Sequence, residues 1–142
     1  MNKNEAKLKI INCFNDEHFV MLDDFLYDIN DLLKRHLKGQ EKVFFSLLIK
    51  NLNHLKEMKK EELTNLKSIE ILKHYTEFVC YSIRIKNSST INIRLLGTFD
   101  ENMFLFLVAF YEVSGKGKNS YKKYVPIALQ RLKEYEKNKE EF

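Results

Sequence analysis

The chain has 142 residues, 44% of them hydrophobic, and its 24 Lys and Arg against 20 Asp and Glu give a formal net charge of +4. This length suits one domain with its own buried core, and only four Gly and one Pro argue against disorder. No apolar run reaches the roughly 18 residues of a membrane span, and the polar N-terminus lacks the apolar stretch of a signal peptide. We therefore expect a single cytoplasmic domain over residues 1–142, with residues 139–142 as a frayed tail.

Charge is unevenly distributed along the chain. Residues 16–31 contain six acids and no Lys or Arg, and residues 114–133 contain six bases and no acid. The basic stretch would attract a polyanion. The simpler interpretation is that both stretches form solvated helix faces, and charge alone favours it.

The first half of the chain predicts one strand and two helices. Residues 6–13 can form a first strand, and Asn15 and Asp16 are typical of a helix start. A helix ended by Gly39 is then predicted by apolar residues at spacings of three and four, namely Phe19, Leu22, Leu26, Ile29 and Leu33. A second helix over residues 40–58 follows so closely that the two should form an antiparallel hairpin.

The second half predicts a sheet and a last helix. Alternation over residues 78–85 and 91–96 predicts two strands joined by a turn at 87–89, and residues 103–111 are apolar on both faces, as in a central strand. A loop over 113–120 precedes a helix over 120–138, in which Pro126 requires a nearby helix start or a kink. The expected fold class is α+β, an N-terminal strand and α-hairpin packed on an antiparallel β-meander with a C-terminal helix.

Three stretches stand out within this order of elements. They are residues 81–85 (Tyr-Ser-Ile-Arg-Ile), residues 93–96 (Ile-Arg-Leu-Leu) followed by Phe99-Asp100, and residues 128–135 (Ala-Leu-Gln-Arg-Leu-Lys-Glu-Tyr). Together with the order of elements, they resemble two strands and the closing helix of the RelE/HigB superfamily of bacterial toxins. The resemblance covers roughly residues 6–138, is closest to the phage-derived HigB-like branch, and implies a RelE/ParE-like fold.

The resemblance also implies a function. Members of this family are toxins of type II toxin–antitoxin systems and act as ribosome-dependent mRNA endonucleases (mRNA interferases). The implied partners are the ribosome, mRNA and a small helix-turn-helix antitoxin, with no cofactor, metal or membrane. Cleavage by attack of the RNA 2′-hydroxyl on the adjacent phosphate needs a base, an acid and positive charge beside the crowded phosphorane.

Arg84 and Arg94 carry over from the resemblance as catalytic residues, because a guanidinium binds phosphate at two points and stays charged. If the turn is the three residues 87–89, the two arginines share a sheet face, one diagonal apart, whereas a two-residue turn would separate them. An equally good explanation of Arg84 and Arg94 is that both are ordinary charged residues on a solvent-exposed face of the sheet, with no role in catalysis. Tyr121 is the third catalytic candidate, and Tyr111, at a buried strand end, is expected in the core.

Five lysines are candidate RNA-binding residues: Lys86, Lys116, Lys118, Lys122 and Lys123. The loop at residues 114–118 has glycines that allow close approach to phosphate, but it does not match a Walker loop. The alternative is a mobile connection that lysines keep soluble.

One departure from the family pattern leaves the function open. Glu112-Val113 stands where many relatives carry a lysine pair, so the general base is missing from its expected position. The alternatives are a non-catalytic relative that binds RNA or protein, a ParE-like inhibitor of DNA gyrase, and a phage or mobile-element protein with an accidental likeness.

Histidine and cysteine give little sign of a metal site. The four histidines have no ligand-like spacing. Cys13 and Cys80 each lie in apolar sequence, so we expect reduced thiols in the core.

Overall fold

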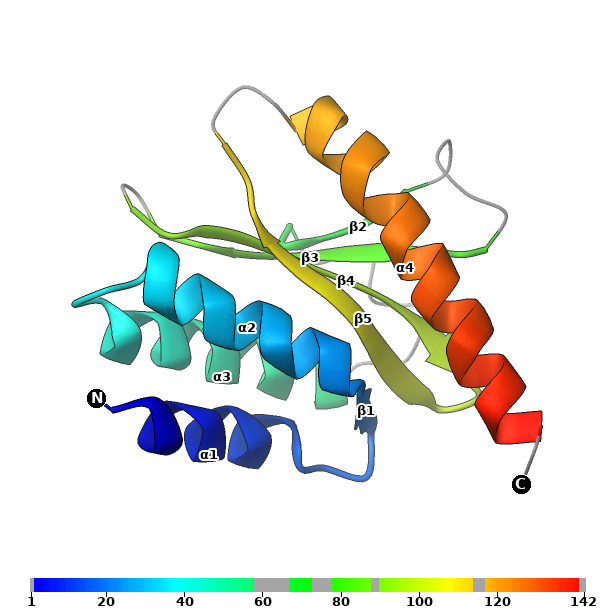
Figure 1. Cartoon of the computed structure of the whole chain (residues 1–142), viewed down its shortest axis with the longest axis horizontal. Helices are drawn as coiled ribbons and strands as arrows, with labels where there is room; N and C mark the ends of the chain where they lie inside the picture. Colours follow the sequence, from blue (N-terminus) through cyan, green and yellow to red (C-terminus); the bar gives the residue numbers. More distant parts are fainter. Residues whose placement is uncertain (1, 58–66, 73–77, 88–89, 114–116, 141–142) are drawn as a thin grey trace.

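The computed structural model describes residues 2–57, 67–72, 78–87, 90–113 and 117–140. Over these ranges the protein has four helices and one five-stranded mixed sheet, so the predicted α+β class is confirmed. Helices α1, α2 and α3 cover one face of the sheet and α4 covers the other (Figure 1). The elements are α1 (Lys3–Phe14), β1 (Phe19–Met21), α2 (Asp23–Arg35), α3 (Glu41–Glu57), β2 (Ile69–Ile71), β3 (Tyr81–Lys86), β4 (Asn92–Asp100), β5 (Met103–Tyr111) and α4 (Gly117–Glu140).

The first element is a helix, so the strand predicted at residues 6–13 is wrong. The Asn2 side chain caps α1 by accepting a hydrogen bond from the Glu5 amide at 2.9 Å. The buried residues Ile10 and Phe14 are four apart, which places them on one helix face. Four-residue spacing therefore outweighs the short apolar run that suggested a strand.

Phe19, predicted to lie on the first amphipathic helix, belongs instead to the strand β1 (Phe19–Met21), so that helix begins only at Asp23 and the predicted start near Asn15 and Asp16 is wrong. Asp16 forms a turn and does not begin a helix, because its carboxylate accepts the His18 backbone N–H at 2.8 Å. The chain leaves this turn extended and pairs with β5. Gly39 lies beyond the end of α2, in the connection to α3, where its φ of 83° uses the freedom of glycine.

The sheet has the strand order β1-β5-β4-β3-β2, with β1 parallel to β5 and the other neighbours antiparallel. The predicted meander is therefore present as β3, β4 and β5, and β5 is an inner strand as expected. The sequence did not indicate β2, which is only three residues long. The predicted second helix corresponds to α3.

Each face of the sheet contributes to its own apolar core. The larger core lies against α1, α2 and α3 and contains five fully buried phenylalanines, namely Phe25, Phe44, Phe45, Phe104 and Phe106. The smaller core lies against α4, whose Val125, Ala128 and Leu132 are buried on one face. Both cysteines are free, Cys80 buried and Cys13 half-buried, and burial raises the pKa of the Cys80 thiol to about 12.

The last helix begins at Gly117 and continues through Pro126 to Glu140. It therefore starts earlier than predicted and includes residues 139 and 140 of the expected frayed tail. Pro126 is exposed, so the carbonyl that loses its helical donor faces water. Of the described helices, none is both long and apolar enough to cross a bilayer.

Candidate functional site

The two arginines singled out by the sequence lie side by side on the α4 face of the sheet. Arg84 of β3 and Arg94 of β4 are direct cross-strand partners, so the prediction that they share a face is confirmed, whereas the three-residue turn at 87–89 and the diagonal offset that it implied are wrong. The connection spans residues 87–91 because the Asn87 carboxamide accepts the backbone N–H groups of Thr90 and Ile91 at 2.9 and 2.7 Å.

The neighbours of the two arginines differ sharply. Arg84 is exposed, whereas Arg94 is only 7% exposed. The Nε of Arg94 donates to the carboxylate of Glu112, which is itself buried, and its Nη1 lies 3.7 Å from Oε1 of Glu70. Glu112, which stands where the resemblance led us to expect a lysine pair, thus supplies a counter-charge for Arg94.

Tyr121 of α4 joins the same site. Its ring centroid lies 6.0 Å from the Arg94 guanidinium carbon. Its hydroxyl lies 3.0 Å from the Ser82 hydroxyl and donates to Oε1 of Glu70 at 2.5 Å. Burial first, and then the hydrogen bond to Glu70, raise the pKa of the Tyr121 hydroxyl. Tyr121 is therefore a hydrogen-bond donor at neutral pH and is not ionised.

These five residues, Glu70, Ser82, Arg94, Glu112 and Tyr121, are called the Arg94 cluster below. Glu70, Ser82 and Arg94 belong to β2, β3 and β4, Glu112 directly follows β5, and Tyr121 belongs to α4. The cluster therefore connects α4 to the sheet through hydrogen bonds and ion pairs. The side chain of Glu70 is 52% exposed, which makes it the acid of the cluster that solvent reaches. Sequence reasoning missed Glu70, although the alternation Ile69-Glu70-Ile71 is the signal of a short strand with one polar face.

The predicted RNA-binding lysines lie outside the Arg94 cluster where the structure describes them. Lys86 ends β3 and is exposed, and Lys122 and Lys123 are exposed on α4. Lys123 lies over the Tyr124 ring at 5.1 Å, and that ring stacks on Phe110. Lys116 lies outside the described residues, and Lys118 lies in the first turn of α4. Tyr111 is half-buried and stacks on His36, with ring centroids 4.4 Å apart.

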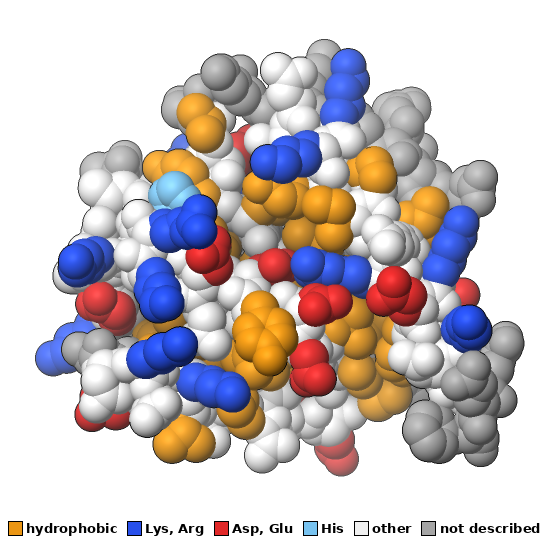
Figure 2. Space-filling model, viewed as in Figure 1, with side chains coloured by type: hydrophobic (Ala, Val, Ile, Leu, Met, Phe, Trp, Pro, Cys, Tyr) orange, Lys and Arg blue, Asp and Glu red, His pale blue; other side chains and the backbone are white. Residues whose placement is uncertain are grey.

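The acidic and basic stretches of the sequence meet in the fold. Arg131 of α4 binds Asp28 of α2 at 2.7 Å and lies 3.9 Å from Asp24. Figure 2 shows acidic and basic side chains interleaved between α2 and α4, with further lysines and arginines over the layer of α1, α2 and α3. The two stretches are thus not simply solvated faces, because part of each neutralises the other.

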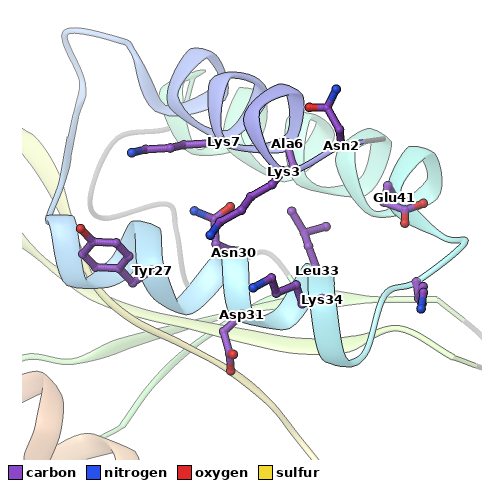
Figure 3. Close-up of a pocket in the computed structure, with 11 residues that line it drawn as sticks. Asn2, Lys3, Ala6, Lys7, Tyr27, Asn30, Asp31, Leu33, Lys34 and Glu41 are labelled. Carbon is purple, nitrogen blue, oxygen red and sulfur yellow. The ribbon is translucent and has the colours of Figure 1, made fainter.

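Two basic grooves lie away from the Arg94 cluster. The larger, about 600 Å³, runs between α1 and α2, with Lys3, Lys7 and Lys34 around it and Tyr27 and Glu41 toward opposite ends (Figure 3). The second, about 350 Å³ and called the β3-edge groove below, lies between α3 and the edge of β3. It is lined by Leu47, Lys50, Asn51, His54, Lys67, Ser68, Arg84 and Lys86.

Metal ligation has no evident site in the described part of the chain. Within it, no three His, Cys, Asp or Glu side chains are grouped closely enough to hold an ion. His18 is held by the Asp16 carboxylate at 2.6 Å, and His74 lies outside the described residues.

Comparisons of this chain with protein-family models, with curated proteins and with solved structures find no match.

Proposed function

We propose that this protein is the cytoplasmic toxin of a type II toxin–antitoxin pair and cuts mRNA at the ribosome by metal-independent attack of the 2′-hydroxyl. The proposal combines the sequence resemblance with one observation of the fold. Arg84 and Arg94 are directly opposed on one sheet face, and Tyr121 lies beside Arg94. Read from β1 onward, the order strand, two helices, meander and last helix is consistent with the RelE/ParE-like arrangement, with α1 and β2 as additions.

The site suggests different roles for the two arginines. The exposed guanidinium of Arg84 is available to a phosphate and would stabilise the charge of the phosphorane. Arg94 is neutralised by Glu112 and would act by holding Tyr121 and Glu70 in place.

Glu70 is the proposed general base. It pairs with Ser82 across β2 and β3, so Arg84, two residues further along β3, is its diagonal neighbour on the same face. An exposed carboxylate can accept the proton of the 2′-hydroxyl while Arg84 binds the phosphate. This assignment supplies the general base that is missing where Glu112-Val113 stands in place of the lysine pair.

A second candidate function is a non-catalytic relative that binds RNA or protein. The buried ion pair of Arg94 and Glu112 favours it, because an arginine already bonded to a carboxylate has little charge left for a phosphorane. In that case the Arg94 cluster has a purely structural role.

Induced expression in a bacterial host tests the proposal, with growth followed and mRNA 5′ ends mapped. The expected result is rapid arrest with cuts inside translated codons, relieved by co-expression of a small helix-turn-helix antitoxin. Arg84→Ala and Glu70→Gln should each abolish the cuts, and Lys7→Ala, an exposed base in the α1–α2 groove, should not. Normal growth with folded protein would select the non-catalytic candidate, and DNA damage without RNA cuts would indicate gyrase inhibition.

A further inference from the structure

The β3-edge groove is strongly basic. Lys50, Lys67, Arg84 and Lys86 line it together with His54, and none of its lining residues is a carboxylate. The described residues offer these four cations no ion pair. From this arrangement we infer that the groove binds the sugar–phosphate backbone of RNA and leads it to Arg84.

Gathering cations without a counter-charge is electrostatically unfavourable, and it is relieved when an anion binds among them. The α1–α2 groove also carries four cationic side chains, all of them lysines, but its lining includes the acids Asp31 and Glu41. The number of cations alone therefore does not distinguish the two grooves, whereas the absence of acids from the lining does.

Regular elements build most of the β3-edge groove. Lys50 and His54 are four residues apart on α3 and so project from one helix face. On the other side, β2 pairs with β3 only as far as Ile83, and the amide of Arg84 then donates to the Ser68 carbonyl at 2.6 Å. Beyond that bond, Lys86 ends an edge that no other described strand covers. The cations are thus held around a gap at the sheet edge.

The lining suits a nucleic acid better than a protein. It contains no Phe, Tyr or Trp, and its one apolar member, Leu47, is half-buried. Protein interfaces depend on buried aromatic and apolar anchors, whereas nucleic-acid interfaces are polar and strongly basic. The choice of RNA over another nucleic acid rests on the proposed function.

Arg84 links the groove to the proposed reaction site. It lines the groove and is also the cross-strand partner of Arg94. A backbone phosphate held by Lys50 and Lys67 would be followed along the strand by one at Arg84, next to Glu70. The groove would thus position the RNA, while residues on the sheet face act on it.

The test compares Lys50→Gln/Lys67→Gln with Lys3→Gln/Lys7→Gln, which removes the same charge from the α1–α2 groove. Binding of a fluorescent oligouridylate to the purified full chain is measured by anisotropy over a range of salt. Each lost phosphate contact should lower the slope of log affinity against log salt by about 0.7, so the groove variant should bind roughly tenfold more weakly at low salt. The α1–α2 variant should bind as the wild type does.

Equal weakening by the two variants would overturn the inference, because it would mean that net charge alone governs binding. Equally tight binding of an oligodeoxythymidylate, or full competition by oligoglutamate at matched charge, would overturn the assignment to RNA. Circular dichroism and thermal unfolding verify that both variants fold. The proposed function fails separately: wild-type protein that binds RNA through the groove yet cuts no transcripts would refute the nuclease and leave the groove assignment intact.

Discussion

Arg131 of α4 binds Asp28 of α2 across the edge of β5, with Nη1 and Oδ2 2.7 Å apart. The same two side chains also satisfy backbone groups of β5 that lie beyond the short strand β1. Asp28 accepts a hydrogen bond from the Ala109 N–H at 3.0 Å, and Arg131 donates one to the Leu107 carbonyl at 2.8 Å. One ion pair therefore joins the helices of the two layers and caps a strand edge that would otherwise expose unpaired groups.

Replacing Asp28 by Ala should lower the free energy of unfolding by about 2–4 kcal/mol, because it leaves a largely buried guanidinium and the Ala109 amide without their acceptor. Urea denaturation measures the loss. Asp31→Ala is the matched control, since the Asp31–Arg35 pair is exposed on the same helix and its removal should cost less than about 1 kcal/mol. Equal losses for the two variants would contradict the edge-capping role of Asp28.

The Arg94–Glu112 pair should be strongly coupled. Arg94→Met alone leaves the Glu112 carboxylate buried and unpaired, and Glu112→Leu alone leaves Arg94 with only the distant Glu70, so each should cost about 3–5 kcal/mol. The double variant should lose clearly less than the sum of these costs. A double-mutant cycle by urea denaturation measures the coupling, and additive losses would show that the two charges do not depend on each other.

Gly97 should not tolerate a side chain. It lies at the register shift between β4 and β5, and a Cβ there would overlap the Leu105 carbonyl oxygen and approach Cζ of Phe104 to 2.8 Å. Because a backbone atom cannot yield, Gly97→Ala should cost about 3 kcal/mol or more. Gly39→Ala is the control: its surroundings are open, and only its positive φ should cost about 1 kcal/mol. In thermal unfolding, the melting temperature of Gly39→Ala should lie well above that of Gly97→Ala.

Low pH should lower the stability of the fold, because it protonates Asp16 and Asp100. The His18 backbone N–H lowers the pKa of Asp16 from 3.8 to about 2, and the hydrogen bond from Lys139, followed by that from Tyr135, lowers the pKa of Asp100. Because both folded-state pKa values lie below the unfolded ones, the stability these groups contribute is present above about pH 4 and is lost as pH falls toward 2.

The test is the melting temperature against pH. Asp16→Asn/Asp100→Asn should melt below the wild type at neutral pH, and the difference should shrink as pH falls from about 4 to 2. A difference that stays constant over this range would show that the two carboxylates stabilise the fold by other means than their charge.

Local sequence alone determined much of this protein. Period-two alternation predicted β3 and β4, a run apolar on both faces predicted β5, and helical spacing predicted α3. An odd number of turn residues placed Arg84 and Arg94 on one face. These features depend on side chains close in the chain, whose periodicity records which face is buried. Short elements escape such reasoning, because the three residues of β1 or β2 show at most one alternation, as in Ile69-Glu70-Ile71, and one alternation does not distinguish a strand from other local structure.

Only the tertiary structure decided what the arginines do. Arg94 is neutralised by Glu112, 18 residues away and directly after the neighbouring strand, and Arg131 by Asp28, 103 residues away on a helix of the other layer. Arg84, with the same chemistry, stays exposed at a groove whose other cations come from α3, from residue 67 and from the end of β3. Sequence shows where charges are, but whether a charge is free depends on which distant side chains the fold places beside it.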